Sequence, residues 1–103
     1  MLLLLIKIKV TKDMISITGH ANYADYGKDI VCAAVSATIM TSIEGISLID
    51  NETIDINQEK DKLDIIIHKH VDTTDKLIEN MLNCLKELAN QYPKNIKIID
   101  KEE

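Results

Sequence analysis

The sequence predicts an α+β fold, with a single sheet and two helices packed on it. Short stretches alternate apolar and polar residues, a pattern typical of strands with one buried face. Two longer stretches place apolar residues at helical spacing. The elements follow the order ββαββαβ, and runs of strands interrupted by helices favour an α+β arrangement. We therefore expect one domain over residues 1–103, with a mostly antiparallel or mixed sheet.

The first two strands form a predicted hairpin. Residues 2–10 alternate toward their end, where Ile6, Ile8 and Val10 are separated by lysines. A short polar turn follows, and the alternation resumes over residues 14–18. Strands joined by so short a turn are expected to pair as neighbours in one sheet.

Residues 29–48 are predicted to form a long apolar helix. Its branched side chains that follow the helical period are Val31, Val35, Ile39, Ile43 and Ile46. We expect such a helix to be buried on most of its circumference. It is also a candidate surface for a second subunit.

The second half of the chain repeats the hairpin and then the helix. Ile54 and Ile56 indicate a strand, residues 58–62 a polar turn, and residues 63–67 the return strand. Asp and Thr residues from 72 to 75 are typical of a helix start.

The second helix carries an apolar stripe and ends at Pro93, because proline cannot continue the hydrogen-bond ladder. The stripe comprises Leu77, Ile78, Met81, Leu82, Leu85, Leu88 and Ala89. Ile96 and Ile98 then predict a last short strand, which a charged tail follows.

The composition excludes several classes of protein. A hydrophobic share of 46% favours a packed core over disorder. The net charge of −5 suits a basic protein partner and argues against nucleic acid, because phosphate binding needs clustered Lys and Arg. Two cysteines give neither a disulfide framework nor a zinc spacing, so a reducing cytoplasm is the expected location. The apolar N-terminal run is too short for a signal peptide, and we expect no membrane span.

The segment between the second strand and the first helix is a candidate active-site loop. Gly19 and Gly27 bound it, and glycine adopts backbone angles that are unfavourable for other residues. It contains Tyr23 and Tyr26, in a chain that has no Phe or Trp. Large side chains placed in a loop are typical of binding and catalysis. Two roles stay open for the tyrosines: walls or a lid for a bound peptide, or packing of the loop on its own domain.

Cys32 and His20 are the residues best suited to nucleophilic chemistry. A helix that begins near Asp29 places Cys32 in its first turn, where unpaired N–H groups and the helix dipole stabilise a thiolate. His20 lies upstream across the loop, far enough for its imidazole to fold back over the helix start. Together they could attack a carbonyl and protonate its leaving amine. The alternative is a buried structural cysteine with a histidine that happens to lie nearby.

Asp29 and Ser36 are candidate supporting residues. Asp29 is expected to cap the helix, a role worth about 1 kcal/mol, and the same carboxylate could orient His20. Ser36 lies one turn beyond Cys32 on the same helix face, where its hydroxyl could bind substrate or support the thiol. Equally, the hydroxyl could donate a hydrogen bond to the carbonyl of Cys32.

The remaining candidates carry weaker signals. His68 and His70 could face one metal ion from a strand end, but no carboxylate or cysteine completes a ligand set. We therefore expect exposed histidines, no metal and no cofactor. Cys84 is predicted to be inert core beside the apolar stripe of the second helix. The acidic residues expected to be solvated surface are Glu79, Glu87, Glu102 and Glu103.

The segment GHANYADYGKDIVCAAVS resembles the signature of a known family, the ribosomal-processing cysteine protease Prp. The residues that carry the resemblance are Gly19-His20-Ala21, Gly27 and the run from Asp29 to Ser36. Chain length and element order also agree with this family, so the resemblance covers nearly the whole chain. Only the signature segment is specific.

The resemblance implies a small α+β homodimer with endopeptidase activity. The family's nucleophile matches Cys32 and its histidine matches His20, while Gly19, Asp29 and Ser36 match other positions tied to activity. The implied substrate is large-subunit ribosomal protein number twenty-seven, from which a short N-terminal extension is removed. The loop after the histidine is implied to become ordered when substrate binds.

Three hypotheses follow for the function. The first is a cysteine endopeptidase in which loop ordering limits cleavage to the correct peptide. The second is a non-catalytic, dimeric ribosome-assembly factor that binds a basic protein tail and would keep its function after Cys32→Ser. The third is a thiol redox sensor, against which the lack of a nearby resolving cysteine counts. The expected partners are a ribosomal protein and a second copy of the chain, without direct nucleic-acid or membrane binding.

Overall fold

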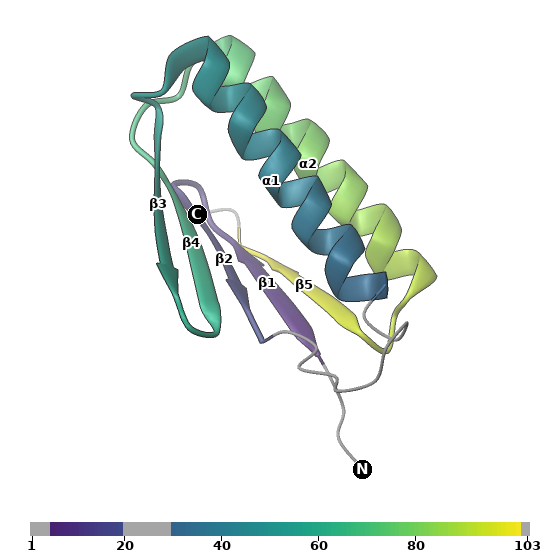
Figure 1. The fold of residues 1–103 in the computed structure, drawn as a ribbon. Coiled ribbons are helices and arrows are strands. Elements are labelled where there is room, and N and C mark those ends of the chain that lie inside the picture. The colour runs from purple at the N-terminus through teal and green to yellow at the C-terminus, as the bar shows by residue number, and fades with distance from the viewer. Residues whose placement is uncertain (1–4, 20–29, 102–103) are drawn as a thin grey trace.

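The structure is a computed structural model that describes residues 5–19 and 30–101 of the 103-residue chain (Figure 1). Its elements in chain order are β1 (Ile6–Val10), β2 (Met14–Thr18), α1 (Ile30–Asp50), β3 (Ile54–Glu59), β4 (Lys62–Ile67), α2 (Asp72–Gln91) and β5 (Ile96–Asp100). This order and the α+β fold class confirm the prediction. The predictions for five loop residues fall outside the described part of the chain: His20, Tyr23, Tyr26, Gly27 and Asp29.

The five strands form one mixed sheet in the order β3-β4-β2-β1-β5. Neighbouring strands are antiparallel except for β1 and β5, which run parallel. The parallel pair arises because α2 carries the chain back along the sheet before β5 begins, as a crossover must (Figure 1). Both helices lie on one face of the sheet. The opposite face carries exposed side chains such as Lys7 and Lys9.

The core lies between the helices and the covered face of the sheet. Alternate residues of β1 and β2 point into it, as the burial of Ile6, Ile8 and Val10 in β1 shows. From α2, Met81 and Leu85 fill its centre and are 1% and 0% exposed. The alternating pattern in the sequence predicted this face because a strand with one buried side repeats every two residues.

Helix α1 is less buried than the sequence indicated. Its buried residues form one stripe: Val31, Val35, Ile39 and Ile46. Its exposed large apolar residues are Ile30, Met40, Leu48 and Ile49. The expectation that most of its circumference would be buried is wrong, because the sheet and α2 contact only one side of the helix (Figure 1).

By length and composition alone, the 21-residue helix α1 could cross a membrane. The expectation of no membrane span stays a prediction, because a helix packed in a protein core can have the same length and composition. Its contact with the core through Val35 and Ile39 accounts for part of the apolar composition. The apolar residues left on the exposed side need a separate explanation.

The β3–β4 hairpin has a shorter turn than predicted. The polar turn was expected over residues 58–62, but only Lys60 and Asp61 lie between the strands. β3 continues to Glu59 because it is an edge strand whose residues after Ile54 are exposed. Polar side chains are therefore compatible with strand structure there.

The limits of two other elements also differ from the prediction. In the described residues β1 begins at Ile6, after Leu5, rather than near residue 2. Helix α1 ends at Asp50, two residues later than predicted.

Gly45 does not interrupt α1, because a residue inside a helix can be glycine at a modest cost of about 1 kcal/mol.

Helix α2 begins without a side-chain cap. Its N-cap is Val71, so the predicted Asp and Thr capping chemistry is absent from that position. Asp72 and Asp75 instead lie within the first turn, where their negative charge interacts favourably with the partial positive charge of the helix start.

Cys84 is exposed on α2, so its assignment to the core is wrong. It lies beside the buried stripe that contains Met81 and Leu85, not within it. Glu79 and Glu87 are exposed, as predicted. Glu102 and Glu103 lie outside the described residues.

Candidate active site

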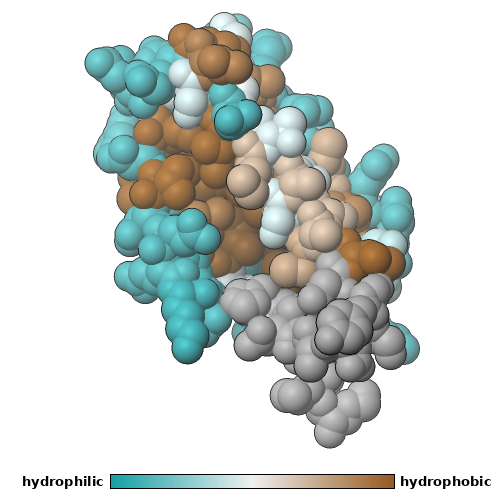
Figure 2. Space-filling model, in the orientation of Figure 1, coloured by the Kyte–Doolittle hydropathy of each residue, from teal (hydrophilic) through white to brown (hydrophobic). Residues whose placement is uncertain are grey.

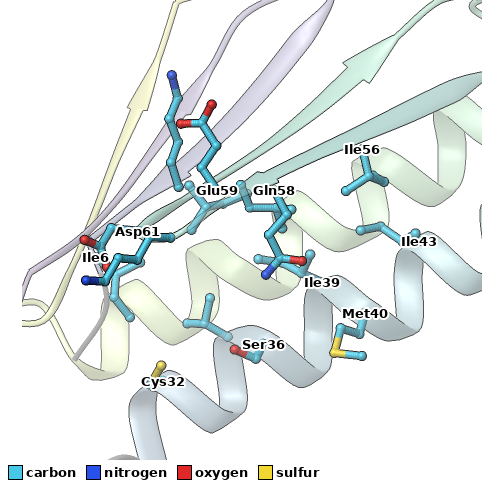
Figure 3. Close-up of a pocket in the computed structure, with 16 residues that line it drawn as sticks. Ile6, Cys32, Ser36, Ile39, Met40, Ile43, Ile56, Gln58, Glu59 and Asp61 are labelled. Carbon is cyan, nitrogen blue, oxygen red and sulfur yellow. The ribbon is translucent and has the colours of Figure 1, made fainter. Parts of the chain in front are cut away.

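Cys32 is the third residue of α1 and lines a groove on the surface (Figure 3). Because the helix begins at Ile30, Cys32 lies in the first turn, where backbone N–H groups have no partner within the helix. The thiol is free and the residue is half-buried. Its sulfur therefore faces a cavity and lies in the partial positive field of the helix start.

The groove runs between the first half of α1 and the β3–β4 hairpin, with a volume of about 310 Å³. Figure 2 shows apolar surface in this hollow, beside hydrophilic surface at its border. From α1, the groove is lined by Cys32, Val35, Ser36, Ile39, Met40 and Ile43. Ile56 and Gln58 of β3 lie across from them (Figure 3). A shape of this kind suits an extended peptide with apolar side chains.

Ser36 presents a hydroxyl to the same groove, one turn beyond Cys32. Two other hydroxyls of α1 bind the carbonyl four residues earlier: Thr38 donates to Ala34 and Ser42 to Thr38, each over 2.8 Å. Among the described residues, Ser36 makes no such bond, although the sequence left that role open. Its hydroxyl is exposed and available to a ligand.

Gly19 borders the groove at the end of β2, where only glycine fits. Its backbone has φ +71°, a left-handed conformation that side chains disfavour. A Cβ at this position would lie 2.5 Å from the carbonyl oxygen of Leu5. The Gly19 N–H donates to the carbonyl of Asp61 over 3.2 Å, which ties this end of β2 to the hairpin turn. Gly19 therefore fixes where the candidate loop leaves the sheet.

Three predicted site residues thus meet in one groove: Gly19, Cys32 and Ser36. The sequence did not single out the apolar residues beside them. The sequence predicts only a strand at Ile56, which is 40% exposed, and Met40 lies outside the predicted apolar stripe of its helix. Sequence signals for both exist: Ile56 is followed by Asn, Gln and Glu in β3, and Met40 is a large apolar residue off the buried face.

His68 and His70 follow β4, which begins at the groove, so they lie at the far end of the sheet from Cys32. They pair with separate carboxylates. His68 Nε2 is 2.7 Å from an oxygen of Asp55. Within residues 5–19 and 30–101, no group of three or more His, Cys, Asp or Glu side chains could hold a metal ion.

His70 joins two parts of the fold. Its Nε2 lies 2.8 Å from Oδ1 of Asp13, in the β1–β2 turn, and its Nδ1 lies 3.2 Å from Oδ1 of Asp75, in α2. The hydrogen bond with Asp13, followed by that with Asp75, raises the pKa of His70 above its ordinary value of 6.5. All three groups lie outside the groove that contains Cys32.

Comparison with known proteins gives one consistent family. The family model described as Cysteine protease Prp matches residues 5–97. The Ribosomal processing cysteine protease Prp of Staphylococcus aureus is 35% identical over 84 residues, which cover 78% of each chain. The protein of that name from Mycoplasma genitalium is 33% identical over 97 residues, 91% of this chain and 94% of the relative.

Solved structures agree with the sequence matches. The S. aureus Prp in complex with a covalently linked product peptide has a TM-score of 0.84 at 27% identity, over 94% of this chain and 100% of that one. The same S. aureus protease in complex with a substrate peptide has a TM-score of 0.74 at 28% identity, over 95% and 99%. The similarity therefore spans both hairpins and both helices.

Proposed function

Because the chain belongs to the Prp family of cysteine proteases, we propose that it removes an N-terminal extension from a ribosomal protein. The names of the curated relatives support ribosomal processing, and the S. aureus structures contain a substrate peptide or a covalently linked product peptide. The proposed substrate is large-subunit ribosomal protein number twenty-seven, which the signature segment implies. The net charge of −5 favours such a basic protein over nucleic acid.

Cys32 is the proposed nucleophile, and its position is the observation that carries the proposal. The thiol lies in the first turn of α1 and on the wall of the groove. The thiolate is the form of a cysteine that attacks a carbonyl carbon. Cys84 is exposed on α2 and does not line the groove, so it is not a competing candidate.

The proposed reaction has two stages. Cys32 Sγ bonds to the scissile carbonyl carbon, and backbone N–H groups at the helix start are suited to bind the resulting oxyanion. His20, the proposed general acid, gives a proton to the amine as the C–N bond breaks and a thioester remains. A water molecule then gives a proton to His20 and attacks the thioester, which releases the thiolate and the carboxylic acid of the product; the acid loses its proton to solvent.

The other signature residues have supporting roles in this proposal. Ser36 is available to bind the peptide because its hydroxyl is exposed in the groove. Asp29 caps α1 or orients the imidazole of His20. The loop residues proposed to close over the bound peptide are Tyr23, Tyr26 and Gly27.

We also propose that the protein is a cytoplasmic homodimer. Leu48 and Ile49, near the end of α1, are 87% and 50% exposed, and a second copy would remove such apolar surface from water. Light scattering after gel filtration tests the dimer, and a monomer throughout the micromolar range would contradict it. Fractionation of the producing cells tests the location.

The function is tested with a synthetic peptide that spans the junction of the ribosomal protein's extension. After incubation with the purified protein, mass spectrometry should find two fragments for the unmodified protein and for Cys84→Ala. Cys32→Ala should leave the peptide intact. If the unmodified protein also leaves it intact, while Cys32→Ser supports ribosome assembly in cells, the chain is a binding factor and not the processing enzyme.

A further inference from the structure

The groove extends well beyond Cys32, and its far end is apolar. Cys32 lies at one end of the close-up in Figure 3, whereas Met40 and Ile43 of α1 lie with Ile56 of β3 at the other end. Met40 is 67% exposed and Ile56 is 40% exposed. Two different elements thus hold large apolar side chains at the surface on either side of one groove, where a ligand could bury them.

We infer that Met40 and Ile56 form a remote subsite that binds one apolar side chain of the substrate, about four residues from the scissile bond. This inference rests on the proposed protease function. It adds a specificity determinant that does not touch the reacting atoms. A protease with such a subsite would distinguish peptides by a residue remote from the bond that it cuts.

The length of α1 between the two ends sets the position of this residue. Met40 is eight positions after Cys32 in the helix, which corresponds to about 12 Å at a rise of about 1.5 Å per residue. An extended peptide advances about 3.4 Å per residue. A chain that starts at the Cys32 sulfur therefore reaches Met40 after about three to four residues.

An extended conformation suits both walls of the groove. Among residues 5–19 and 30–101, β3 is an edge strand, so one side of its backbone has no partner strand in the sheet. Unpaired strand edges bind extended peptides through main-chain hydrogen bonds. Side chains of an extended peptide alternate, so its second and fourth residues face the same side. The second residue would then lie over Val35 and Ile39, and the fourth between Met40 and Ile56.

The polarity of the groove selects the kind of side chain. The charged residues that line it belong to the hairpin turn and its flanks, from Glu59 to Lys62. In Figure 3, Glu59 and Asp61 lie apart from Met40, Ile43 and Ile56. A charged substrate residue at the far end would lose water without gaining an opposite charge, whereas an apolar one would gain burial.

The test is a cycle of two substrates and two proteins. In the first pair of junction peptides, the fourth residue before the scissile bond is Leu in one peptide and Ala in the other. In the second pair, the fourth residue after the scissile bond is Leu or Ala. Each is assayed with the unmodified protein and with Met40→Ala or Ile56→Ala. Met14→Ala is the matched control, because Met14 is 38% exposed on β2 and does not line the groove.

For one of the two peptide pairs, Met40→Ala and Ile56→Ala should each lower kcat/KM about tenfold for the Leu peptide and less than about twofold for the Ala peptide. Met14→Ala should change neither. Equal losses for both peptides would mean that the variants act through the fold, and no loss would mean that the subsite does not bind this residue. Either result overturns the inference. A third result would also overturn the inference: Met40→Ala converts the dimer to a monomer and lowers kcat/KM equally for the Leu and Ala peptides. The far end of the groove would then bind a second copy of the chain.

The inference and the proposed function fail in different ways. If the unmodified protein cleaves no peptide, the proposed function fails. Fluorescence anisotropy with labelled Leu and Ala peptides then measures binding directly. A Leu preference of about tenfold in Kd that Met40→Ala removes would retain the subsite, and equal binding of both peptides would overturn it.

Discussion

Two glycines that differ in backbone conformation and in surroundings give a sharp test of the structure. Gly19 directly follows β2 and has a left-handed conformation with φ +71°, and a Cβ there would lie 2.5 Å from the carbonyl oxygen of Leu5. Gly45 lies inside α1, where a Cβ would make an ordinary contact of 3.8 Å with Cδ1 of Leu77. The same substitution, Gly→Ala, should therefore have opposite effects at the two positions.

The magnitudes follow from the two backbone conformations. For Gly19→Ala, the left-handed backbone costs about 1–2 kcal/mol, and displacing the Leu5 carbonyl brings the loss to about 2–4 kcal/mol. In a domain of this size a loss of about 2 kcal/mol lowers Tm by about 8–16 °C. Gly45→Ala should instead stabilise the protein by about 1 kcal/mol, because alanine favours the helix and the site has room for a methyl group.

Thermal unfolding followed by circular dichroism measures both effects, and peptide cleavage is assayed below both transitions. Gly19→Ala should also reduce cleavage, because the clash displaces Gly19, which borders the groove that contains Cys32. Gly45→Ala should retain the activity. If Gly19→Ala raised Tm, or if both variants shifted it equally, the backbone at the start of the loop would differ from the one described.

Three further perturbations test the core, a buried polar pair and the charged end of the fold. Leu85→Ala empties a site that is 0% exposed and should cost about 2–5 kcal/mol in chemical denaturation, whereas a loss under 1 kcal/mol would refute its central position. Ser16 donates to Asp64 over 2.6 Å, and Ser16→Ala should lower the free energy of unfolding by about 1–3 kcal/mol because Asp64 is buried; no change would contradict that bond. The raised pKa of His70 means that its folded form holds a proton more tightly, so its stabilising effect is full below pH 6.5 and is lost as pH rises through the raised value. The Tm difference between the unmodified protein and His70→Gln should accordingly shrink from acid to alkaline pH, and a difference that grows with pH would reverse the assignment.

Much of the fold could be predicted from local patterns. The alternation in β1 and β2 and the period of α2 identify elements because each buries one face. The strand order was not accessible, because it depends on which edges meet after the helices pack. The parallel pairing of β1 with β5, between opposite ends of the chain, is of this kind.

The errors have physical causes that can be named. Helix α1 is apolar on nearly all sides, so its composition could not show that Met40 and Leu48 would be exposed. Cys84 is exposed although the next residue of α2, Leu85, is buried, because neighbouring residues of a helix point in different directions. The turn of the second hairpin was predicted too long because polar residues in an exposed edge strand resemble a loop.

The candidate site was predicted in part. A cysteine at the start of a helix and a serine one turn later share a face by helical geometry alone, and Gly19 marks the turn that precedes them. The groove between α1 and the hairpin was not predictable, because it depends on the distance between elements that are remote in sequence. Ile56 shows this, since its position in the sequence is that of a core strand residue and its side chain lines the groove.

The central claim is that the sulfur of Cys32 forms a covalent bond to the substrate. Rapid acid quenching of the protein with its junction peptide, followed by digestion and mass spectrometry, locates that bond directly. The account predicts an acyl adduct on the segment that contains Cys32, present also in Cys84→Ala and absent from Cys32→Ala. An adduct on Cys84, or cleavage that persists in Cys32→Ala, would contradict it.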